Sequence, residues 1–591
     1  MQNQTHIFNR LKPLLITSIQ VILLALLTMF LCQFSVGCSM RDIISSYVYV
    51  LYILVYTVLF SIVYVITGRI TLSHGIVMYL LLAVSILDYQ VYLFRGSEIT
   101  FGELNLLETA LGIAGNYTFT VTWKMIVSAV VIAAVVFALH KTCVQKKEDV
   151  NRFRIWFLVI SVCACFIVHR NIDNLPVVTF ENNGMSMNTF PLNLIRQAYG
   201  YNIEEPQGYD TEQLNQVISQ YTVNQVQKDE LPDVIVIMNE SFADLSCLGD
   251  LSIDDYIPYF HQIQSVSVSG YMHVPAYGGG TANTEWEFLT GHTMHYLPEG
   301  TVSYDYASLT NSYSSIVRQM KGYGYHTIAM HPYYSYMYTR KAVFPKLGFD
   351  EQYFIDDFPQ ENMMREYVSD EEMYEQLIQR YESADQKDPL FLFGITMQNH
   401  GPYDYEGENF TDTVDITGYG DYPKAQQYLT LMKESDQALH VLMDYFSSID
   451  KPVILAFFGD HLPSIEQELY ETIGRDLSSE AYQRAIHQVP FMIWSNQSNE
   501  SITIDHISVN YFSSLILETA GIPLPAYNQF LMDVYQQFPI IAGDYLYSSE
   551  KEEYISYEEL NDEDKKLIIS YEGFVYNALC DDRNRLPVFT H

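Results

Sequence analysis

Four short apolar runs in the second half of the chain each lead to a side chain that can bind a metal ion or a phosphate. The runs cover residues 234–238, 327–330, 390–393 and 453–458. They lead to Glu240, His331, His400 and the adjacent pair Asp460 and His461. Helical patterns alternate with the runs, at residues 312–321, 371–383 and 425–448. This alternation favours a layered α/β fold with a largely parallel sheet. Because ligands bind beyond the carboxyl ends of such strands, we expect these side chains to meet at one edge.

The first part of the chain has a different character. Five stretches are apolar enough to span a bilayer, which takes about 20 residues each. They lie at residues 14–36, 47–67, 72–93, 125–140 and 155–168, and the last two are short. Residues 1–170 contain seven acidic and twelve basic side chains, whereas residues 171–591 contain 63 acidic and 20 basic ones. The sequence therefore predicts a polytopic α-helical membrane domain followed by an acidic, water-soluble part with no nucleic-acid partner.

The basic residues of the short loops predict the orientation, because Lys and Arg stay on the cytoplasmic side. The loop between the fourth and fifth stretches is the most basic, with Lys141, Lys146, Lys147, Arg152 and Arg154. Five spans then place the N-terminus inside and residues 171–591 outside the cell. A cleaved signal peptide is the alternative interpretation of the first stretch, but the stretch is long and no small-residue cleavage site stands out. We expect a multi-pass protein of the cell membrane with an extracellular catalytic domain.

Patterning predicts four regions along the chain. These are a five-helix transmembrane domain (1–170), an extracellular linker (171–230), a catalytic domain (231–525) and an acidic C-terminal extension (526–591). Cys247 and Cys580 are the only cysteines of the soluble part, so no disulfide framework is implied, and whether they pair stays open. No CxxC spacing occurs, so any metal ion must be held by oxygen and imidazole ligands.

Glu240, Asp460 and His461 are the candidate metal ligands. Carboxylate oxygens with an imidazole nitrogen suit Mn²⁺ or Mg²⁺, or Zn²⁺ where the geometry is tetrahedral. A lone acid after a strand is also a common helix cap, and Glu240 by itself fits that role. The adjacent Asp460 and His461, at the end of a strongly apolar strand, have no evident packing role, so they favour the metal site.

Thr281 follows three glycines, residues 278–280, and precedes a helical pattern at residues 282–289. It would lie at a helix N-terminus, where free N–H groups and the positive end of the dipole favour a phosphate. An ordinary threonine N-cap would give the same local pattern. A hydroxyl becomes a good nucleophile when its pKa falls, and coordination to a metal ion has that effect. Thr281 is therefore the candidate nucleophile.

His331, His400 and Arg340 form a second set of candidates. An arginine can bind two phosphate oxygens at once, and a histidine can pass a proton to or from a reacting oxygen. Each histidine could instead be a satisfied polar residue in a loop, and residues 399–402 are turn-like. Because the soluble part is strongly acidic, an anionic substrate would need such a local cationic pocket.

Together these motifs resemble the lipoteichoic acid synthase family of bacterial membrane phosphoglycerol transferases, in the sulfatase and alkaline phosphatase superfamily. Val-Ile-Met-Asn-Glu240-Ser241 is similar to the family's first metal-binding strand, and Gly-Gly-Gly-Thr281-Ala-Asn-Thr-Glu-Trp-Glu-Phe is similar to its nucleophile segment. The segment from His331 to Arg340, Asn-His400-Gly-Pro and Gly-Asp460-His461 follow in the family's order. The resemblance covers nearly the whole chain and implies an extracellular sulfatase-like, alkaline phosphatase-like domain.

The resemblance also implies roles for individual residues. The metal ligands would be Glu240, Thr281, Asp460 and His461, usually around Mn²⁺. The glycerol phosphate would be handled by His331, Arg340 and His400, with Tyr338 beside them. Two departures from the family lie near this pocket: Tyr338 replaces a tryptophan two residues before the arginine, and Ser464 is shifted by one position after Asp460-His461.

The resemblance therefore implies transfer of glycerol phosphate from phosphatidylglycerol to a glycolipid or polyglycerolphosphate acceptor. The step would pass through a phospho-threonine, with His400 transferring the proton. A phosphoethanolamine transferase of the same superfamily is an alternative, although its outer domain is usually rich in disulfides. A sulfatase is disfavoured because no Cys or Ser lies in a Cys/Ser-x-Pro-x-Arg motif near Thr281. A catalytically inactive, membrane-anchored polymer-binding protein is a third interpretation, which would not need both a nucleophile and a complete ligand set.

Overall fold

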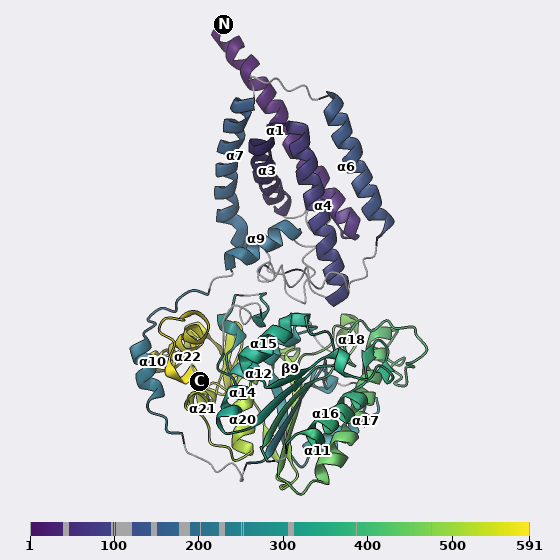
Figure 1. The fold of residues 1–591 in the computed structure, drawn as a ribbon, viewed down its shortest axis with the longest axis vertical. Helices are drawn as coiled ribbons and strands as arrows, with labels where there is room; N and C mark the ends of the chain where they lie inside the picture. The colour runs from purple at the N-terminus through teal and green to yellow at the C-terminus, as the bar shows by residue number, and fades with distance from the viewer. Residues whose placement is uncertain are drawn as a thin grey trace. The chain divides into compact units, whose positions relative to one another are not determined.

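The computed structural model forms two compact units (Figure 1), which are described here separately. One comprises Met1–Asn202 with Glu299–Thr301, and the other comprises Ile203–Pro298 with Val302–His591. The structure describes residues 2–39, 47–95, 99, 101, 121–142, 150–175, 189–200, 203–223, 231–249, 251, 253–298, 300–304, 313–385, 387–473 and 476–589. The predicted regions at 1–170, 171–230, 231–525 and 526–591 remain predictions in their exact limits. Much of the basic loop, at 143–149, and of the linker, at 176–188, lies outside the described residues.

The first unit is a bundle of long apolar helices. They are α1 (Gln2–Val36), α3 (Val48–Thr67), α4 (Ile70–Arg95), α6 (Trp123–Thr142) and α7 (Val150–Asn171), with the shorter α9 (Phe190–Gly200) after them. Among the described residues, five helices are long and apolar enough to cross a membrane, which confirms the five predicted spans. The last two helices extend beyond the predicted stretches because their ends carry polar residues, such as Lys124 and Arg152, that interrupt the apolar pattern.

The second unit is built on an eight-stranded sheet with the order β10-β2-β9-β8-β1-β7-β3-β4. The strands are β1 (Asp233–Asn239), β2 (Val268–His273), β3 (His326–Met330), β4 (Glu351–Tyr353), β7 (Leu390–Ile395), β8 (Val453–Gly459), β9 (Gln488–Ser495) and β10 (Ile502–Ile504). The four apolar runs form β1, β3, β7 and β8, which are parallel neighbours in the middle of the sheet. Their carboxyl ends therefore lie at one edge, as the pattern predicted.

Helices cover both faces of this sheet, which explains why its central strands are buried along their whole length. One layer contains α11 (Pro258–Gln264), α16 (Asp370–Ser383) and α17 (Pro423–Ser447), and the other contains α14 (Ile316–Gly322) and α20 (Phe512–Thr519), as Figure 1 shows. Between these elements lie α12 (Thr281–Thr290), α15 (Arg340–Leu347), α18 (Gln467–Thr472), α19 (Glu480–Ala485) and the small hairpin of β5 (Met363–Met364) and β6 (Tyr367–Val368). The predicted α/β architecture is thus confirmed.

The C-terminal residues pack against the same unit. They form α21 (Ala526–Gln537), a three-stranded sheet of β11 (Ile540–Ile541), β12 (Tyr545–Ser548) and β13 (Glu553–Ser556), and α22 (Asp562–Cys580). Helix α10 (Thr211–Ile218) contacts α21 and α22. The buried Tyr571 of α22 donates a hydrogen bond to the carbonyl oxygen of Gly291 at 2.8 Å, just after α12. This contact connects the C-terminal segment to the helix that carries Thr281.

Candidate active site

Strand register brings the first two candidate ligands together. In the parallel pairing of β1 with β8, Asn239 is opposite Gly459. The next residues along the chain, Glu240 and Asp460, therefore leave neighbouring strands side by side. His461 follows directly, and ligand atoms of these three buried residues all lie within 4.8 Å of one another. The structure thus brings together the carboxylates and the imidazole that the sequence singled out.

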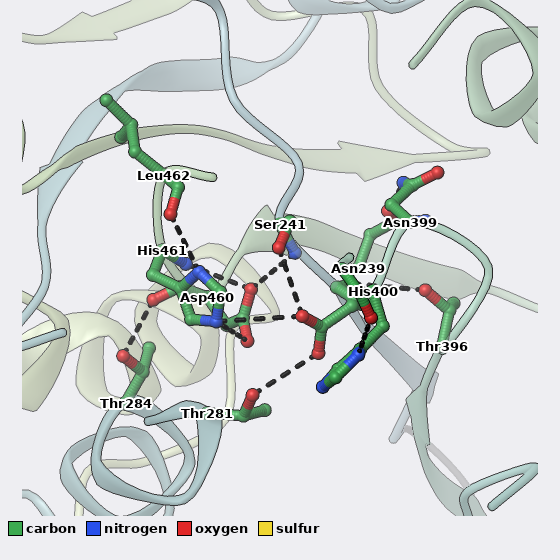
Figure 2. Close-up of polar contacts among 12 residues, drawn as sticks. Asn239, Ser241, Thr281, Thr284, Thr396, Asn399, His400, Asp460, His461 and Leu462 are labelled. Atoms are coloured by element: carbon green, nitrogen blue, oxygen red, sulfur yellow. Dashed lines mark hydrogen bonds and ion pairs between the residues drawn. The ribbon is translucent and has the colours of Figure 1, made fainter. Parts of the chain in front are cut away.

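Hydrogen bonds hold this cluster in a defined arrangement (Figure 2). Asp460 Oδ1 accepts from the backbone N–H groups of Ser241 at 2.7 Å and His461 at 2.9 Å. The Ser241 hydroxyl donates to Glu240 Oε1 at 3.0 Å, with Ser241 in the left-handed region at φ 52°. A strained backbone at a residue without glycine's freedom is a feature of functional sites. It aims both polar groups of Ser241 at the two carboxylates.

His461 has a fixed ring orientation. Its Nδ1 lies 2.9 Å from the carbonyl oxygen of Leu462, so Nδ1–H donates there. Nε2 then faces the carboxylates, 3.3 Å from Asp460 Oδ2 and 3.6 Å from Glu240 Oε1. A backbone carbonyl that fixes one ring nitrogen while the other faces acids is typical of a metal-binding histidine.

The electrostatics of the cluster also indicate a missing positive charge. Burial, followed by the negative charge of Glu240, raises the pKa of Asp460 to about 7. Burial lowers the pKa of His461, but the charges of Asp460 and Glu240 outweigh burial, so its pKa is raised overall. Asp460 Oδ2 is buried and accepts no hydrogen bond from the residues that the structure describes. Its ion-pair partner is His461 Nε2 at 3.3 Å, so one imidazole faces two buried carboxylates, which is costly unless a further cation compensates them.

Thr281 lies at the edge of this cluster. Residues Gly278 to Gly280 all have positive φ values, 68°, 151° and 94°, which only glycine adopts readily. They turn the chain sharply, so that α12 begins at Thr281. The Thr281 hydroxyl donates to Glu240 Oε2 at 3.2 Å, and the hydroxyl of Thr284, on the same helix, donates to the carbonyl oxygen of Asp460 at 2.7 Å. The nucleophile candidate is therefore both at a helix N-terminus and beside the carboxylates.

His331, directly after β3, and Arg340, the first residue of α15, form a buried pair. Arg340 Nε and Nη2 donate to Glu285 Oε2 at 3.0 and 2.8 Å, and its Nη1 donates to His331 Nε2 at 3.1 Å. Tyr304 completes the arrangement by donating to Glu285 Oε1 at 2.6 Å. Among the residues that the structure describes, three of the five N–H donors of Arg340 are thus engaged, which leaves two for a substrate. Burial, followed by the positive charge of Arg340, lowers the pKa of His331 well below its usual value.

The loop before Arg340 is strained. Tyr338 and Thr339 are consecutive residues with φ values of 50° and 54°. The Tyr338 ring lies 5.1 Å from the Arg340 guanidinium carbon, in a cation–π contact. Two such residues next to a buried arginine cost free energy that the surrounding contacts must offset. This segment is where the resemblance placed a tryptophan, and Tyr338 supplies the aromatic ring beside the arginine.

His400 lies in a loop after β7 that other residues clamp. Arg365 donates to the carbonyl oxygens of Gln398, His400 and Pro402. His400 Nδ1 lies 2.6 Å from the carbonyl oxygen of Gly401 and 3.2 Å from the Tyr367 hydroxyl. Nδ1–H therefore donates to Gly401, and Nε2 is the ring nitrogen left for proton transfer. Figure 2 shows Ser241, Thr281, Asp460 and His461 grouped about one point, with His400 approaching from another side.

Asp370, which sequence reasoning missed, joins the start of the loop that carries Glu240 to the start of the loop that carries His400. Its Oδ2 accepts from Asn239, directly before Glu240, at 2.8 Å, and from Ser435. Asn399, directly before His400, donates to Asn239 Oδ1 at 3.0 Å. Burial raises the pKa of Asp370 to about 6. The asparagines next to the two candidates were the available signal, because a buried amide beside a functional residue often orients it.

Comparisons with known proteins agree with this architecture. Residues 232–522 match the family model described as Sulfatase. A Rhizobium meliloti (strain 1021) protein described as "Putative cyclic beta-1,2-glucan modification protein" is 30% identical over 375 residues, which cover 61% of this chain and 56% of that protein. A second protein of that organism, described as "Capsular polysaccharide biosynthesis protein RkpI", is 29% identical over 265 residues, 43% of this chain and 45% of that protein. The chain spans about half the length of the curated relatives it matches.

Among solved structures, the chain is similar to the Streptococcus pyogenes phosphoglycerol transferase GacH in complex with sn-glycerol-1-phosphate. The TM-score is 0.50 at 22% identity, and the match covers 64% of this chain and 95% of that one. At this identity the likeness establishes a shared fold. The family match and the observed sheet agree on the same region, so residues 232–522 of this chain form a sulfatase-like α/β domain.

Proposed function

We propose that this protein is a membrane-bound phosphoglycerol transferase that moves glycerol phosphate from phosphatidylglycerol to an acceptor of the cell envelope. The observation that carries the proposal is the position of Thr281. Its hydroxyl lies 3.2 Å from Glu240 Oε2, at the start of α12 and beside the cluster with Asp460 and His461. GacH, which shares the fold and was solved in complex with sn-glycerol-1-phosphate, supports the choice of transferred group.

The residues present fit a divalent cation. Glu240, Asp460, His461 and Thr281 would hold it, and the observation that calls for a cation is the pair of buried carboxylates that face a single imidazole. Mn²⁺ suits this set of oxygen and imidazole ligands, and Mg²⁺ or Zn²⁺ are the alternatives. When bound, the cation would lower the pKa of the threonine hydroxyl and stabilise negative charge on the phosphate.

In the first step, Thr281 Oγ1 passes its proton to Glu240 Oε2, to which it donates a hydrogen bond, and forms a bond to phosphorus while the bond from phosphorus to the diacylglycerol oxygen breaks. His400 Nε2 supplies the proton to that leaving oxygen. The remaining N–H donors of Arg340 and the N-terminus of α12 bind the non-bridging oxygens. The product is a glycerophospho-threonine on Thr281 and free diacylglycerol.

In the second step, an acceptor hydroxyl attacks the same phosphorus and the bond to Thr281 Oγ1 breaks. His400 now takes the proton from the acceptor, and Glu240 returns to Thr281 Oγ1 the proton that it took in the first step. His331 stays neutral because its pKa is lowered, and we assign it to holding Arg340 rather than to proton transfer. Tyr338 would pack beside the bound glycerol phosphate, next to Arg340.

The five membrane-spanning helices support a lipid donor. A soluble domain joined to such helices stays close to the bilayer, where the effective concentration of phosphatidylglycerol is high. We place the catalytic domain on the outer side of the membrane, as the basic loops predict.

The test is diacylglycerol release by the full-length protein in mixed micelles with fluorescent phosphatidylglycerol, with Mn²⁺ or with EDTA. The matched control for Thr281→Ala is Thr290→Ala, a second buried threonine of α12 whose hydroxyl donates to the backbone of Trp286. We expect metal-dependent release that Thr281→Ala abolishes and Thr290→Ala retains. Release from phosphatidylethanolamine but not phosphatidylglycerol would instead establish a phosphoethanolamine transferase, and no release from either lipid would contradict the proposal.

A further inference from the structure

A continuous series of aromatic rings leads away from His400. The His400 ring is 5.5 Å from that of Tyr367, which is 6.0 Å from Tyr333. Tyr333 is 4.9 Å from Tyr334, and Tyr334 is stacked on Tyr336 at 5.2 Å with an interplanar angle of 14°. We call Tyr333, Tyr334, Tyr336 and Tyr367 the aromatic shelf. The aromatic shelf begins beside His400, the candidate for proton transfer.

Exposure increases along the shelf. Tyr367, next to His400, is 9% exposed, Tyr333 and Tyr336 are half-buried, and Tyr334 is 39% exposed. The shelf therefore connects the buried reacting centre to solvent. A purely structural aromatic cluster would place its rings in the core, where each buries the most apolar area.

The backbone under the shelf is held by hydrogen bonds on both sides. The N–H of Ile355 donates to the carbonyl oxygen of Tyr333 at 3.0 Å, and the N–H of Thr339 donates to that of Tyr336 at 2.9 Å. The Tyr367 hydroxyl donates to Gly401, and its ring lies 5.5 Å from the Arg365 guanidinium carbon. The rings are thus held in place before a ligand arrives, which reduces the entropy lost on binding.

We propose that the aromatic shelf binds the sugar rings of a neutral glycan, which delivers its hydroxyl to the active site as the acceptor. This inference rests on the proposed function and names the acceptor class for that site. Aromatic rings offer flat, weakly polar faces for the C–H faces of sugars, and their hydroxyls and nearby carboxylates can bond sugar hydroxyls. Exposed acids adjoin the shelf, because Asp356 and Asp357 follow the residue paired with Tyr333.

The local charge favours a neutral glycan over two other occupants. An anionic polymer would be repelled by Asp356, Asp357 and the acidic outer unit. A surface of anionic lipid attracts clusters of exposed Lys and Arg, whereas Arg365, the cation beside Tyr367, is buried and the exposed Asp356 and Asp357 are acids. The curated relatives, a glucan modification protein and a capsular polysaccharide biosynthesis protein, are both named for sugar polymers.

The chemistry balances with a sugar hydroxyl as the acceptor. Its oxygen forms the new bond to phosphorus as the bond from phosphorus to Thr281 Oγ1 breaks. The hydroxyl proton passes to His400, and Thr281 regains a proton. The products are the glycerophosphorylated glycan and the free threonine, with no oxidant or further reactant.

The test compares two acceptors with the full-length protein: cyclic β-1,2-glucan, and glycerol, which has no ring to stack. The double variant Tyr334→Ala, Tyr336→Ala is measured beside Tyr576→Ala, a half-buried tyrosine of α22 whose ring contacts Tyr209. We expect the double variant to lower the ratio of transfer to glucan over transfer to glycerol about tenfold, as loss of two ring contacts predicts. A second double variant, Tyr334→Trp with Tyr336→Trp, keeps two aromatic rings and should have a ratio close to that of the wild-type protein.

A ratio unchanged in the double variant would overturn the inference. Equal losses with both acceptors in lipid vesicles, absent in detergent micelles, would identify the shelf as a membrane contact and also overturn it. Glucan binding by isothermal titration calorimetry separates the inference from the proposed function, because it requires no lipid donor. If the wild-type protein binds glucan and the double variant binds it more weakly, the aromatic shelf is a glycan-binding surface even if phosphatidylglycerol is not the donor. If the wild-type protein does not bind glucan, the inference is wrong.

Discussion

The buried ion pair between Arg340 and Glu285 gives the most quantitative prediction. The two side chains are 2% and 0% exposed, and Glu285 accepts two hydrogen bonds from Arg340 and one from Tyr304. Glu285→Ala leaves the guanidinium charge buried without its partner, which costs about 3–5 kcal/mol. Glu285→Gln should cost less, because an amide oxygen can still accept from Arg340.

The matched control is Glu480→Ala, which removes the partner of Arg484 in an exposed pair within one helix. Glu480 is 88% exposed, and such pairs contribute about 0–1 kcal/mol. Thermal unfolding of the full-length protein in detergent, followed by tryptophan fluorescence, should show Glu285→Ala lowering the Tm by on the order of 6–20 °C, from about 2–4 °C per kcal/mol for domains of moderate size. A Glu285→Ala protein as stable as Glu480→Ala would refute the reasoning that this pair is buried and coupled.

Three further predictions concern the cation, pH and the buried network. Added Mn²⁺ should stabilise the wild-type protein by about 2.7 kcal/mol at a hundredfold excess over the Kd, which is measured as a rise in Tm. Asp460→Asn should lose this rise but keep the stability that the wild-type protein has in EDTA. A rise in Tm that persists in Asp460→Asn would contradict the assigned ligands. His261 donates hydrogen bonds to the carboxylates of Asp244 and Asp255, and these bonds, the one to Asp244 foremost, outweigh burial and raise the pKa of His261 to about 9. The pKa of His261 in the folded protein exceeds its ordinary value of 6.5, so protonated His261 stabilises the folded state. In urea titrations, the free energy of unfolding of the wild type should exceed that of His261→Ala by a full amount below about pH 6.5, and the excess should shrink as the pH rises through about 9. A difference that stays constant with pH would contradict this prediction. Asp370→Ala should lower kcat, because Asn239 and Ser435, to which Asn399 donates, lose the carboxylate that accepts their hydrogen bonds, whereas Asp370→Asn should retain more activity; equal rates for the two variants would argue against this positioning role.

The central strands were predictable from the sequence because each is a short apolar run with a polar residue after it. Parallel strands in one sheet share an edge, so Glu240 and Asp460 could be placed together before their register was known. The same argument could not find β9, where Pro490 lies inside the strand and pairs with Tyr271. A proline in such a run argues against a central strand, although β9 lies between β2 and β8.

The support around the site was less predictable. Glu285 lies four residues after Thr281, but its partner Arg340 is 55 positions further along, and no local pattern connects them. The strain at Ser241 and Tyr338 likewise depends on tertiary contacts, because neither residue type signals a left-handed backbone. The candidates themselves were recognisable by residue type and by resemblance, whereas their positioning partners required the fold.

The most direct test of the central claim is to identify the covalent intermediate. Full-length wild-type protein would be incubated with phosphatidylglycerol and Mn²⁺ in the absence of an acceptor, which the second step requires, and then quenched, digested and examined by mass spectrometry. The account predicts a glycerol phosphate adduct on Thr281 that is absent from Thr281→Ala. Diacylglycerol release with no adduct on Thr281, or with the adduct on another residue, would contradict it.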